Sequence, residues 1–240
     1  MGSSPSGSRR FPRVALDGAS FASWAMLDLK TGELIGSANL AAPGDTMSLV
    51  KVWIAADFLS RARSKPDRET LERLSEMIRD SDNDIATEFH NRNATKASIE
   101  RMVRVCGLTD AHAGTVEYRW SDTVISARDT ARLGGCVADG RAAGPWTAWL
   151  LTQMRGVRGD GDFGPRKAFP AAEARDIAIK NGWYAREEDG LWHVSCLAIG
   201  ATWSLGVLVR YPAEEGMELG TSLCESAGAQ LMPYLRQQAP

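Results

Sequence analysis

The chain has 240 residues, of which 44% are hydrophobic and 24% charged, a composition typical of one large domain or of two interleaved parts. Acidic and basic residues nearly balance at a net charge of -2, which argues against proteins that bind nucleic acids or membrane surfaces through charge. No apolar run reaches the roughly 20 residues of a transmembrane helix, so we expect no membrane-spanning segment.

The first residues differ in composition from the rest of the chain. They are rich in serine and glycine and contain no apolar stretch of the kind that a signal peptide requires. We interpret residues 1–12 as a disordered tag or linker and expect that a native signal sequence has been removed. Residues 13–240 are interpreted as a single domain.

The predicted elements begin with a β-hairpin. Two short apolar runs, 22–29 and 33–37, lie on either side of the turn residues Lys30-Thr31-Gly32. Residues 42–45, Ala-Pro-Gly-Asp, indicate a loop. The following stretch, 48–62, contains no glycine or proline and is apolar on nearly every face, which predicts a buried helix.

Further helices follow from the helical spacing of apolar residues or from capping residues. We expect them at 69–79, at 97–106 with Gly107 as its cap, from Ser126 to near Gly134-Gly135, and from Pro145 to Met154. The stretches 108–122 and 156–171 are predicted to be long loops, the second because it is rich in glycine and proline.

The last third of the chain predicts three strands and a helix. Strand-like runs at 176–183, 191–199 and 203–211 have short gaps, which favour an antiparallel meander, and 217–236 is expected to be helical. With the hairpin, this gives an α/β (α+β) fold with a five-stranded antiparallel sheet. We assign 13–45 and 172–240 to the α/β part and 46–171 to an inserted helical part.

Three short motifs occur in order along the chain. They are Ser48-Leu49-Val50-Lys51, Ser81-Asp82-Asn83 and Lys180-Asn181-Gly182. Together they resemble the S-x-x-K, S-D-N and K-T-G motifs of class A β-lactamases and penicillin-binding proteins. The resemblance extends from about residue 20 to the C-terminus. It implies a β-lactamase/transpeptidase-like fold and a serine hydrolase or acyltransferase that works through an acyl-enzyme.

The first motif provides a nucleophile and a base. Ser48 and Lys51 are three residues apart at the start of a helix, so their side chains share one face. A serine hydroxyl needs a base to take its proton, and lysine can act as one only when burial or neighbouring charge makes its amine neutral. The resemblance also implies an oxyanion hole formed by the backbone N–H groups of Ser48 and Trp183.

The other two motifs are expected to surround this pair. By resemblance, Ser81 relays a proton toward the leaving group, and Asn83 hydrogen-bonds Lys51 and the substrate amide. Lys180, on an edge strand, is expected to hold the substrate carboxylate and to shape the pKa of Ser81. Asp82 is expected to hold its own loop together.

Four residues are predicted to form the substrate surface. Asn181 can donate its amide to a carboxylate, and Gly182 allows a ligand to approach the strand closely. Trp183 follows the third motif directly and is expected to line the pocket. Trp120 is a second aromatic residue predicted near the site.

The sequence departs from the family in two places. Its third motif has asparagine where the family has threonine or serine, which weakens the case for β-lactam recognition. The family's deacylation glutamate, followed three residues later by Leu-Asn, has no clear counterpart. Glu117 is the candidate, with the alternative that it is an exposed loop carboxylate. We therefore predict slow release of a penicilloyl group.

The cysteines leave several arrangements open. Four cysteines allow three pairings, and the spacing alone favours neither two disulfides nor four thiols. None lies in a metal-binding pattern with another cysteine or with a histidine, so we expect no metal and no cofactor. The resemblance implies an extracytoplasmic protein, secreted or anchored to the envelope, in an oxidising environment. On that basis the preferred pairs are Cys106–Cys136 and Cys196–Cys224.

Two function classes follow from these observations. The first is an active serine hydrolase, expected to be a monomer without nucleic-acid partners, acting on a small-molecule or peptidoglycan-derived substrate such as a β-lactam or a D-alanyl peptide. The second is a catalytically inactive binding protein of the cell envelope that kept the fold. Labelling of Ser48 by an acylating probe distinguishes them.

Overall fold

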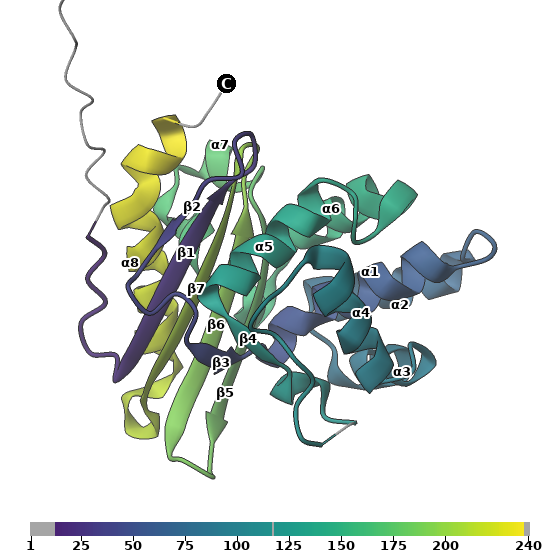
Figure 1. Cartoon of the computed structure of the whole chain (residues 1–240), viewed down its shortest axis with the longest axis horizontal. Helices are drawn as coiled ribbons and strands as arrows, with labels where there is room; N and C mark the ends of the chain where they lie inside the picture. Colours follow the sequence, from purple (N-terminus) through teal and green to yellow (C-terminus); the bar gives the residue numbers. More distant parts are fainter. Residues whose placement is uncertain (1–12, 117, 238–240) are drawn as a thin grey trace, which may run out of the picture.

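The computed structural model describes residues 13–116 and 118–237. Its main feature is a five-stranded antiparallel sheet in the order β2-β1-β7-β6-β5 (Figure 1). The strands are β1 (Phe21–Asp28), β2 (Leu34–Gly36), β5 (Ala178–Arg186), β6 (Leu191–Ile199) and β7 (Trp203–Pro212). The predicted hairpin, meander and sheet are therefore confirmed.

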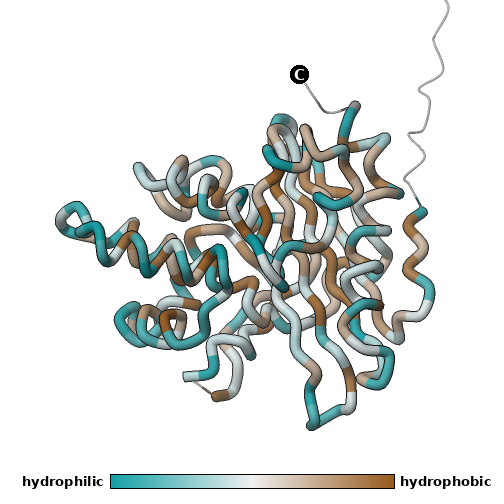
Figure 2. Tube along the Cα trace, turned by 180° about the vertical axis from the view of Figure 1, so that it is seen from behind, coloured by the Kyte–Doolittle hydropathy of each residue, from teal (hydrophilic) through white to brown (hydrophobic). Residues whose placement is uncertain are grey.

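Helices cover both faces of the sheet. Helix α8 (Gly216–Gln237) packs on β6 and β7 from one side, and α5 (Ala127–Ala138) packs on β1, β6 and β7 from the other. The central strands β6 and β7 are accordingly almost entirely buried, as their nearly continuous apolar sequences require. Figure 2 shows hydrophobic stretches along the strands and hydrophilic ones at the turns and outer helices.

The helical part lies beside the α5 face of the sheet (Figure 1). Its helices are α1 (Lys51–Arg61), α2 (Arg68–Arg79), α3 (Asn83–Arg92), α4 (Lys96–Cys106) and α6 (Thr147–Arg155). Helix α1 contacts α2, α3, α4 and α6 and is buried along most of its length, which explains its all-round apolar sequence. Whether 46–171 behaves as a separate part stays a prediction.

Helix α3 was not anticipated from the sequence. Its residues are largely polar and follow α2 after a short turn, so periodicity gave no clear signal. The local cause of the helix is its N-cap: Asp82 Oδ1 accepts a hydrogen bond of 2.8 Å from the backbone N–H of Ile85. The predicted structural role of Asp82 is thus visible in the structure.

The end of one predicted helix and the assignment of one predicted loop were wrong for identifiable reasons. Helix α5 does not end near Gly134-Gly135 but continues to Ala138, because these glycines let the helix approach the sheet. A Cβ atom on Gly134 would lie 2.0 Å from Ser204 Oγ, and one on Gly135 2.7 Å from Leu27 Cδ2. The predicted loop 42–45 contains a short strand, β3 (Pro43–Asp45), because it finds a partner in β4 (Val124–Ser126).

The two long loops contain only short elements. The first, before β4, has the single 3-10 turn Trp120–Asp122, and the second has 3-10 turns at Gly159–Gly161 and Pro165–Ala168 before the short helix α7 (Ala171–Ala174). Both predicted disulfides are present, Cys106–Cys136 between α4 and α5 and Cys196–Cys224 between β6 and α8. No helix of the described chain has the length and apolarity needed to cross a bilayer. The predicted tag, 1–12, lies outside the described residues.

Candidate active site

Ser48 lies in a 3-10 turn that is pressed against the edge of the sheet. The turn η1 (Met47–Val50) leads directly into α1, and β5 is the edge strand beside it. A Cβ atom on Gly182 of β5 would lie 2.4 Å from Thr46 O and 2.5 Å from the Ser48 backbone nitrogen. Only glycine fits at this contact, so Gly182 serves the packing of the turn on the strand.

Two residues of the site have positive φ angles. Met47, immediately before Ser48, has φ 47°, and Ser81 has φ 63°. Such conformations cost a non-glycine residue about 1–3 kcal/mol and are typical of functional sites held by their surroundings. They fix the direction in which the two serines enter the site.

Lys51 connects the first two motifs. Its Nζ atom donates to Asn83 Oδ1 at 2.7 Å and to Ser81 Oγ at 3.2 Å, and it also donates to the Ser81 backbone carbonyl. Because α3 begins at Asn83 and Ser81 precedes it in the turn, helices α1 and α3 together position the cluster. The predicted contact between Lys51 and Asn83 is therefore present.

The amine of Lys51 has an environment suited to a base. Burial lowers the pKa of Lys51 from its ordinary value to about 7, although the charge of Asp82 partly opposes this shift. The Nζ atom also lies 4.7 Å from the centroid of the Trp120 ring. A substantial share of this amine is thus neutral at neutral pH, which is the form that can accept a proton.

The hydroxyl of Ser48 is not engaged by the described residues. Its side chain is partly exposed, lines a cleft and makes no hydrogen bond with any of them, whereas Lys51 Nζ is directed to Ser81 and Asn83. The direct Ser48–Lys51 hydrogen bond is therefore not formed here. In sites without substrate, catalytic hydrogen bonds are often long or poorly aligned.

Lys180 completes the group from the sheet side. Its Nζ atom donates to Ser81 Oγ at 2.9 Å, so Ser81 lies between two lysines. Burial first, and the nearby charge of Lys51 second, lower the pKa of Lys180 well below its ordinary value. The predicted contact between Lys180 and Ser81 is thus present. Lys180 is fully buried, however, so its amine does not line the cleft where a substrate carboxylate would lie.

Asn181 occupies a different place from the one predicted. Its side chain is fully buried, and its amide nitrogen donates to Gly161 O at 3.0 Å and to Phe163 O at 2.8 Å. Successive residues of a strand point to opposite faces, so with Lys180 facing Ser81 the next side chain faces the loop beneath β5. The expectation that Asn181 binds a substrate carboxylate does not hold in this geometry, in which it anchors that loop.

The two predicted tryptophans both line the cleft. Trp183 also packs edge-on against Phe163, with ring centroids 5.5 Å apart. Trp120 is fixed by a 3.1 Å hydrogen bond from its Nε1 atom to Thr87 Oγ1 of α3. Glu117, the candidate for deacylation, lies outside the described residues, so its role stays a prediction.

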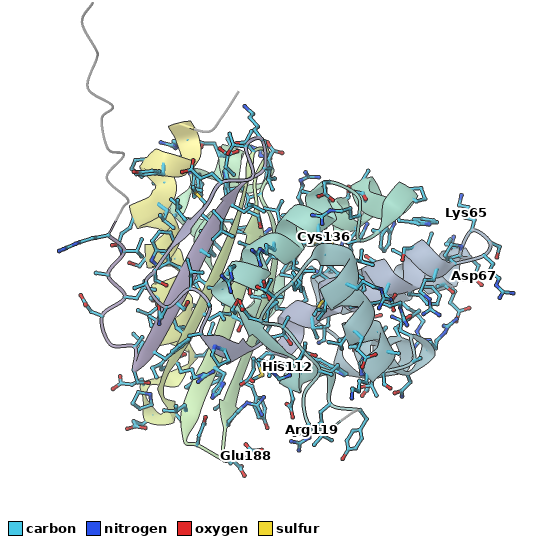
Figure 3. The ribbon with its side chains drawn as sticks, in the orientation of Figure 1. Lys65, Asp67, His112, Arg119, Cys136 and Glu188 are labelled. Carbon is cyan, nitrogen blue, oxygen red and sulfur yellow. A yellow bond between two sulfur atoms is a disulfide. The ribbon has the colours of Figure 1, made fainter. Side chains whose placement is uncertain are left out.

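The cleft has a volume of about 700 Å³. It is formed by the turn η1, by Asn83 of the second motif, by the loop before β4 and by the β5–β6 hairpin. Its lining residues are Met47, Ser48, Asn83, Arg119, Trp120, Ser121, Asp122, Trp183, Tyr184, Arg186, Glu187 and Glu188. In Figure 3 the labelled Arg119 and Glu188, two of these lining residues, lie at the lower edge of the molecule.

A charged network beside the cleft was missed from the sequence. Arg186 pairs with Asp122 at 2.9 Å and with Asp45 at 3.4 Å, and Asp45 also contacts His193 Nδ1 at 2.7 Å. Burial acts to raise the pKa of Asp45, but the His193 hydrogen bond and the Arg186 charge outweigh it and lower that pKa. Every second residue of a strand points to the same face, so Arg186 shares a face with Lys180. The sequence would have indicated this if the predicted strand had continued beyond residue 183.

The polar groups of the site do not form a metal centre. Among the residues that the structure describes, no group of three or more His, Cys, Asp or Glu side chains is arranged to hold a metal ion.

Comparisons with known proteins agree on the fold. No family model matches the sequence, and a search of curated proteins found no match. Among solved structures, the TLA-3 extended-spectrum β-lactamase is similar with a TM-score of 0.75 and 12% identity, over 91% of this chain and 94% of that one.

Two further structures give the same result. A β-lactamase from Xanthomonas campestris has a TM-score of 0.70 and 15% identity, over 91% of this chain and 93% of that one. An ancestral class A β-lactamase has a TM-score of 0.68 and 16% identity, over 90% and 95%. The chain therefore has a class A β-lactamase-like fold, as its three motifs predicted.

Proposed function

We propose that this protein is a serine hydrolase or acyltransferase that forms an acyl-enzyme on Ser48. The observation that carries the proposal is the buried Lys51 amine, with its pKa lowered to about 7. It lies three residues from a serine hydroxyl that lines the cleft and makes no hydrogen bond with the residues that the structure describes. A nucleophile beside an amine that can be neutral is the arrangement that covalent catalysis requires.

The proposed reaction has two steps. In the first, Ser48 Oγ attacks the carbonyl carbon of an amide or ester while its proton passes to neutral Lys51 Nζ. The tetrahedral oxyanion is stabilised by the backbone N–H groups of Ser48 and Trp183. The proton then reaches the leaving nitrogen or oxygen through Ser81, which contacts both Lys51 and Lys180. The carbon–leaving-group bond breaks and the acyl-enzyme remains.

In the second step, water or another acceptor cleaves the ester bond to Ser48. Glu117 is the proposed carboxylate for activating water, and slow deacylation is expected because no Leu-Asn follows it at the family's spacing. β-Lactams and D-alanyl peptides are the proposed substrate examples. Toward penicillins, we expect fast or moderate formation of the acyl-enzyme, followed by slow release.

The proposed location is outside the cytoplasm, with the protein acting as a monomer on a small molecule or a peptidoglycan-derived substrate. The two disulfides support this location, because such bonds persist in oxidising compartments. The lack of a membrane-spanning helix in the described chain fits a protein secreted or held at the envelope by other means.

The test is covalent labelling read by intact mass. The wild-type protein is incubated with a neutral fluorophosphonate and, separately, with a fluorescent penicillin. We expect a single adduct on Ser48, its loss in Ser48→Ala, and its retention in Ser60→Ala, which removes an exposed serine near the end of α1, the helix that follows Ser48.

Two results would contradict the proposal. Silence toward every acylating probe, in correctly folded protein, would support the non-catalytic binding protein instead. Turnover of nitrocefin at about ten per second or faster would show efficient deacylation and refute the slow-release step.

A further inference from the structure

The arginines that line the cleft are already paired with carboxylates. Arg186 is mostly buried and lies 2.9 Å from Asp122 and 3.4 Å from Asp45. Arg119 lies 3.6 Å from Asp122 and 3.9 Å from Glu188. Each guanidinium group would therefore have to share its charge between these carboxylates and an incoming substrate carboxylate.

The groups expected to bind a substrate carboxylate do not reach the cleft either. Lys180 is fully buried and donates to Ser81. The amide of Asn181 is turned to the opposite face of β5 and bonded to the loop beneath it. Among the described residues, the lining of the cleft thus holds no cation without a carboxylate partner.

Carboxylates and aromatic rings also line the same opening. Glu187 and Glu188 follow the end of β5, both are exposed, and within the described chain Glu187 makes no ion pair. Tyr184, whose exposed fraction is 59%, and Trp120 line the cleft with them. Carboxylates next to aromatic faces are the surroundings that stabilise an ammonium group.

We propose that the cleft selects amide or ester substrates that carry an ammonium group directed toward Glu187 and Glu188, and disfavours substrates with a carboxylate in that position. This inference rests on the proposed acyl-enzyme chemistry at Ser48 and defines its substrate class. It ranks β-lactams and D-alanyl peptides, which carry a carboxylate beside the scissile amide, below ammonium-bearing amides and esters as acyl donors for this site.

The test uses matched 4-nitrophenyl esters of linear acids that end in a trimethylammonium, a tert-butyl or a carboxylate group. Acylation is followed by nitrophenol release and corrected with Ser48→Ala. We expect the ammonium ester to acylate about tenfold faster than the carboxylate ester at low salt, with the tert-butyl ester between them. Raising the ionic strength to about 1 M should reduce this ratio, because exposed charges are screened.

Charge variants assign the selectivity to the two glutamates. In E187Q/E188Q the ratio of ammonium to carboxylate ester rates should fall at least about threefold. The matched control E218Q/E225Q removes two exposed carboxylates from α8, on the far face of the sheet, and should keep the wild-type ratio.

The outcomes separate this inference from the proposed function. If the neutral fluorophosphonate labels Ser48 but the carboxylate ester reacts as fast as the ammonium ester, the substrate class is wrong and the enzyme remains. An unchanged ratio in E187Q/E188Q likewise contradicts it. If no probe labels Ser48, the proposed function fails and the inference fails with it.

Discussion

The floor and the rim of the cleft are built in opposite ways. We call floor the two cleft-lining residues Ser48 and Asn83 together with Lys51, Ser81 and Lys180, which lie behind them and do not line the cleft. Its two lysines are buried with lowered pKa values and hydrogen-bonded to neutral groups. The rim consists of Arg119, Asp122, Tyr184, Arg186, Glu187 and Glu188. It is at least partly exposed to solvent, and most of it is charged.

This difference separates reactivity from selectivity. Burial changes which protonation state a floor residue adopts, and so decides whether the residue can exchange a proton. Exposed charges on the rim act on a substrate through screened attraction or repulsion. Changes in the floor should therefore alter rates by large factors for every substrate, and changes in the rim by small factors that depend on substrate charge.

The largest effect is expected from Lys51→Met, which keeps most of the side-chain volume but removes the amine. Without a base for Ser48, acylation by the neutral ester should slow about 10³-fold. Lys65→Met, at an exposed lysine in the loop after α1, is the control and should react like the wild type. A Lys51→Met protein that retains a tenth of the wild-type rate would show that another group activates Ser48.

Gly182→Ala tests the contact between the floor and the edge strand. The added Cβ would lie within 2.6 Å of Thr46 O, Ser48 N and Met47 Cβ, so the turn carrying the nucleophile must shift. We expect acylation to fall about 10²-fold, since a displacement of about 1 Å has this effect. Circular dichroism would check that the variant is folded. A wild-type rate in Gly182→Ala would mean that the turn adjusts without cost.

The pH dependence tests the protonation state of the floor. Because neutral Lys51 is required and its pKa is about 7, the acylation rate should fall about tenfold per unit as the pH drops below 7. Above that value the rate should level off. A profile without an inflection between pH 6 and about 8 would contradict the assignment of Lys51 as the base.

The same shift has a consequence for stability, with a defined sign. The folded-state pKa of Lys51 is below its unfolded value, so between these values the unfolded chain binds more protons, and the free energy of unfolding rises with pH. The rise should approach about 1 kcal/mol per unit above pH 7 and be smaller in Lys51→Met. Urea unfolding at pH 7 and 9 measures it, and equal slopes in both proteins would contradict it.

The smallest effect is expected on the rim, from Asp122→Asn. This change removes the 2.9 Å partner of Arg186 and leaves that guanidinium freer to meet an anionic substrate. Acylation by the carboxylate ester should rise about threefold, with little change for the tert-butyl ester. Asp139→Asn, at an exposed carboxylate after α5, is the control. An equal change for both esters would indicate a structural effect.

The floor could be predicted from the sequence because its residues lie in short motifs. The spacing within each motif, together with the helix or strand on which the motif lies, determines where the side chains point. Ser48 and Lys51 are one turn apart, and Asp82 caps the helix that begins at Asn83. The burial of Lys51 was anticipated from the apolar sequence around it. The five-stranded sheet followed from short apolar, strand-like runs separated by short gaps.

The rim could not be predicted in this way. The end of β5 was placed at residue 183, so Tyr184 and Arg186 were not recognised as strand residues facing the cleft. The pairing of Arg186 with Asp122 joins positions 64 residues apart through long side chains, and no local pattern indicates it. Asn181 was assigned to the substrate because its chemistry suits a carboxylate, but the alternation of β5 turns it away.

The short β3–β4 ladder joins the point where the chain leaves the sheet to the point just before α5 returns to it. Pro43 pairs with Ser126 and Asp45 with Val124. The segment between β3 and β4 is therefore an insertion whose two ends are held side by side. Such an insertion can change length far from its paired ends, for example at the exposed residues 63–65 after α1, without moving those ends, which form its base. Because Ser48 lies within a few residues of that base, the nucleophile stays in register with the sheet when the chain changes length at this far side.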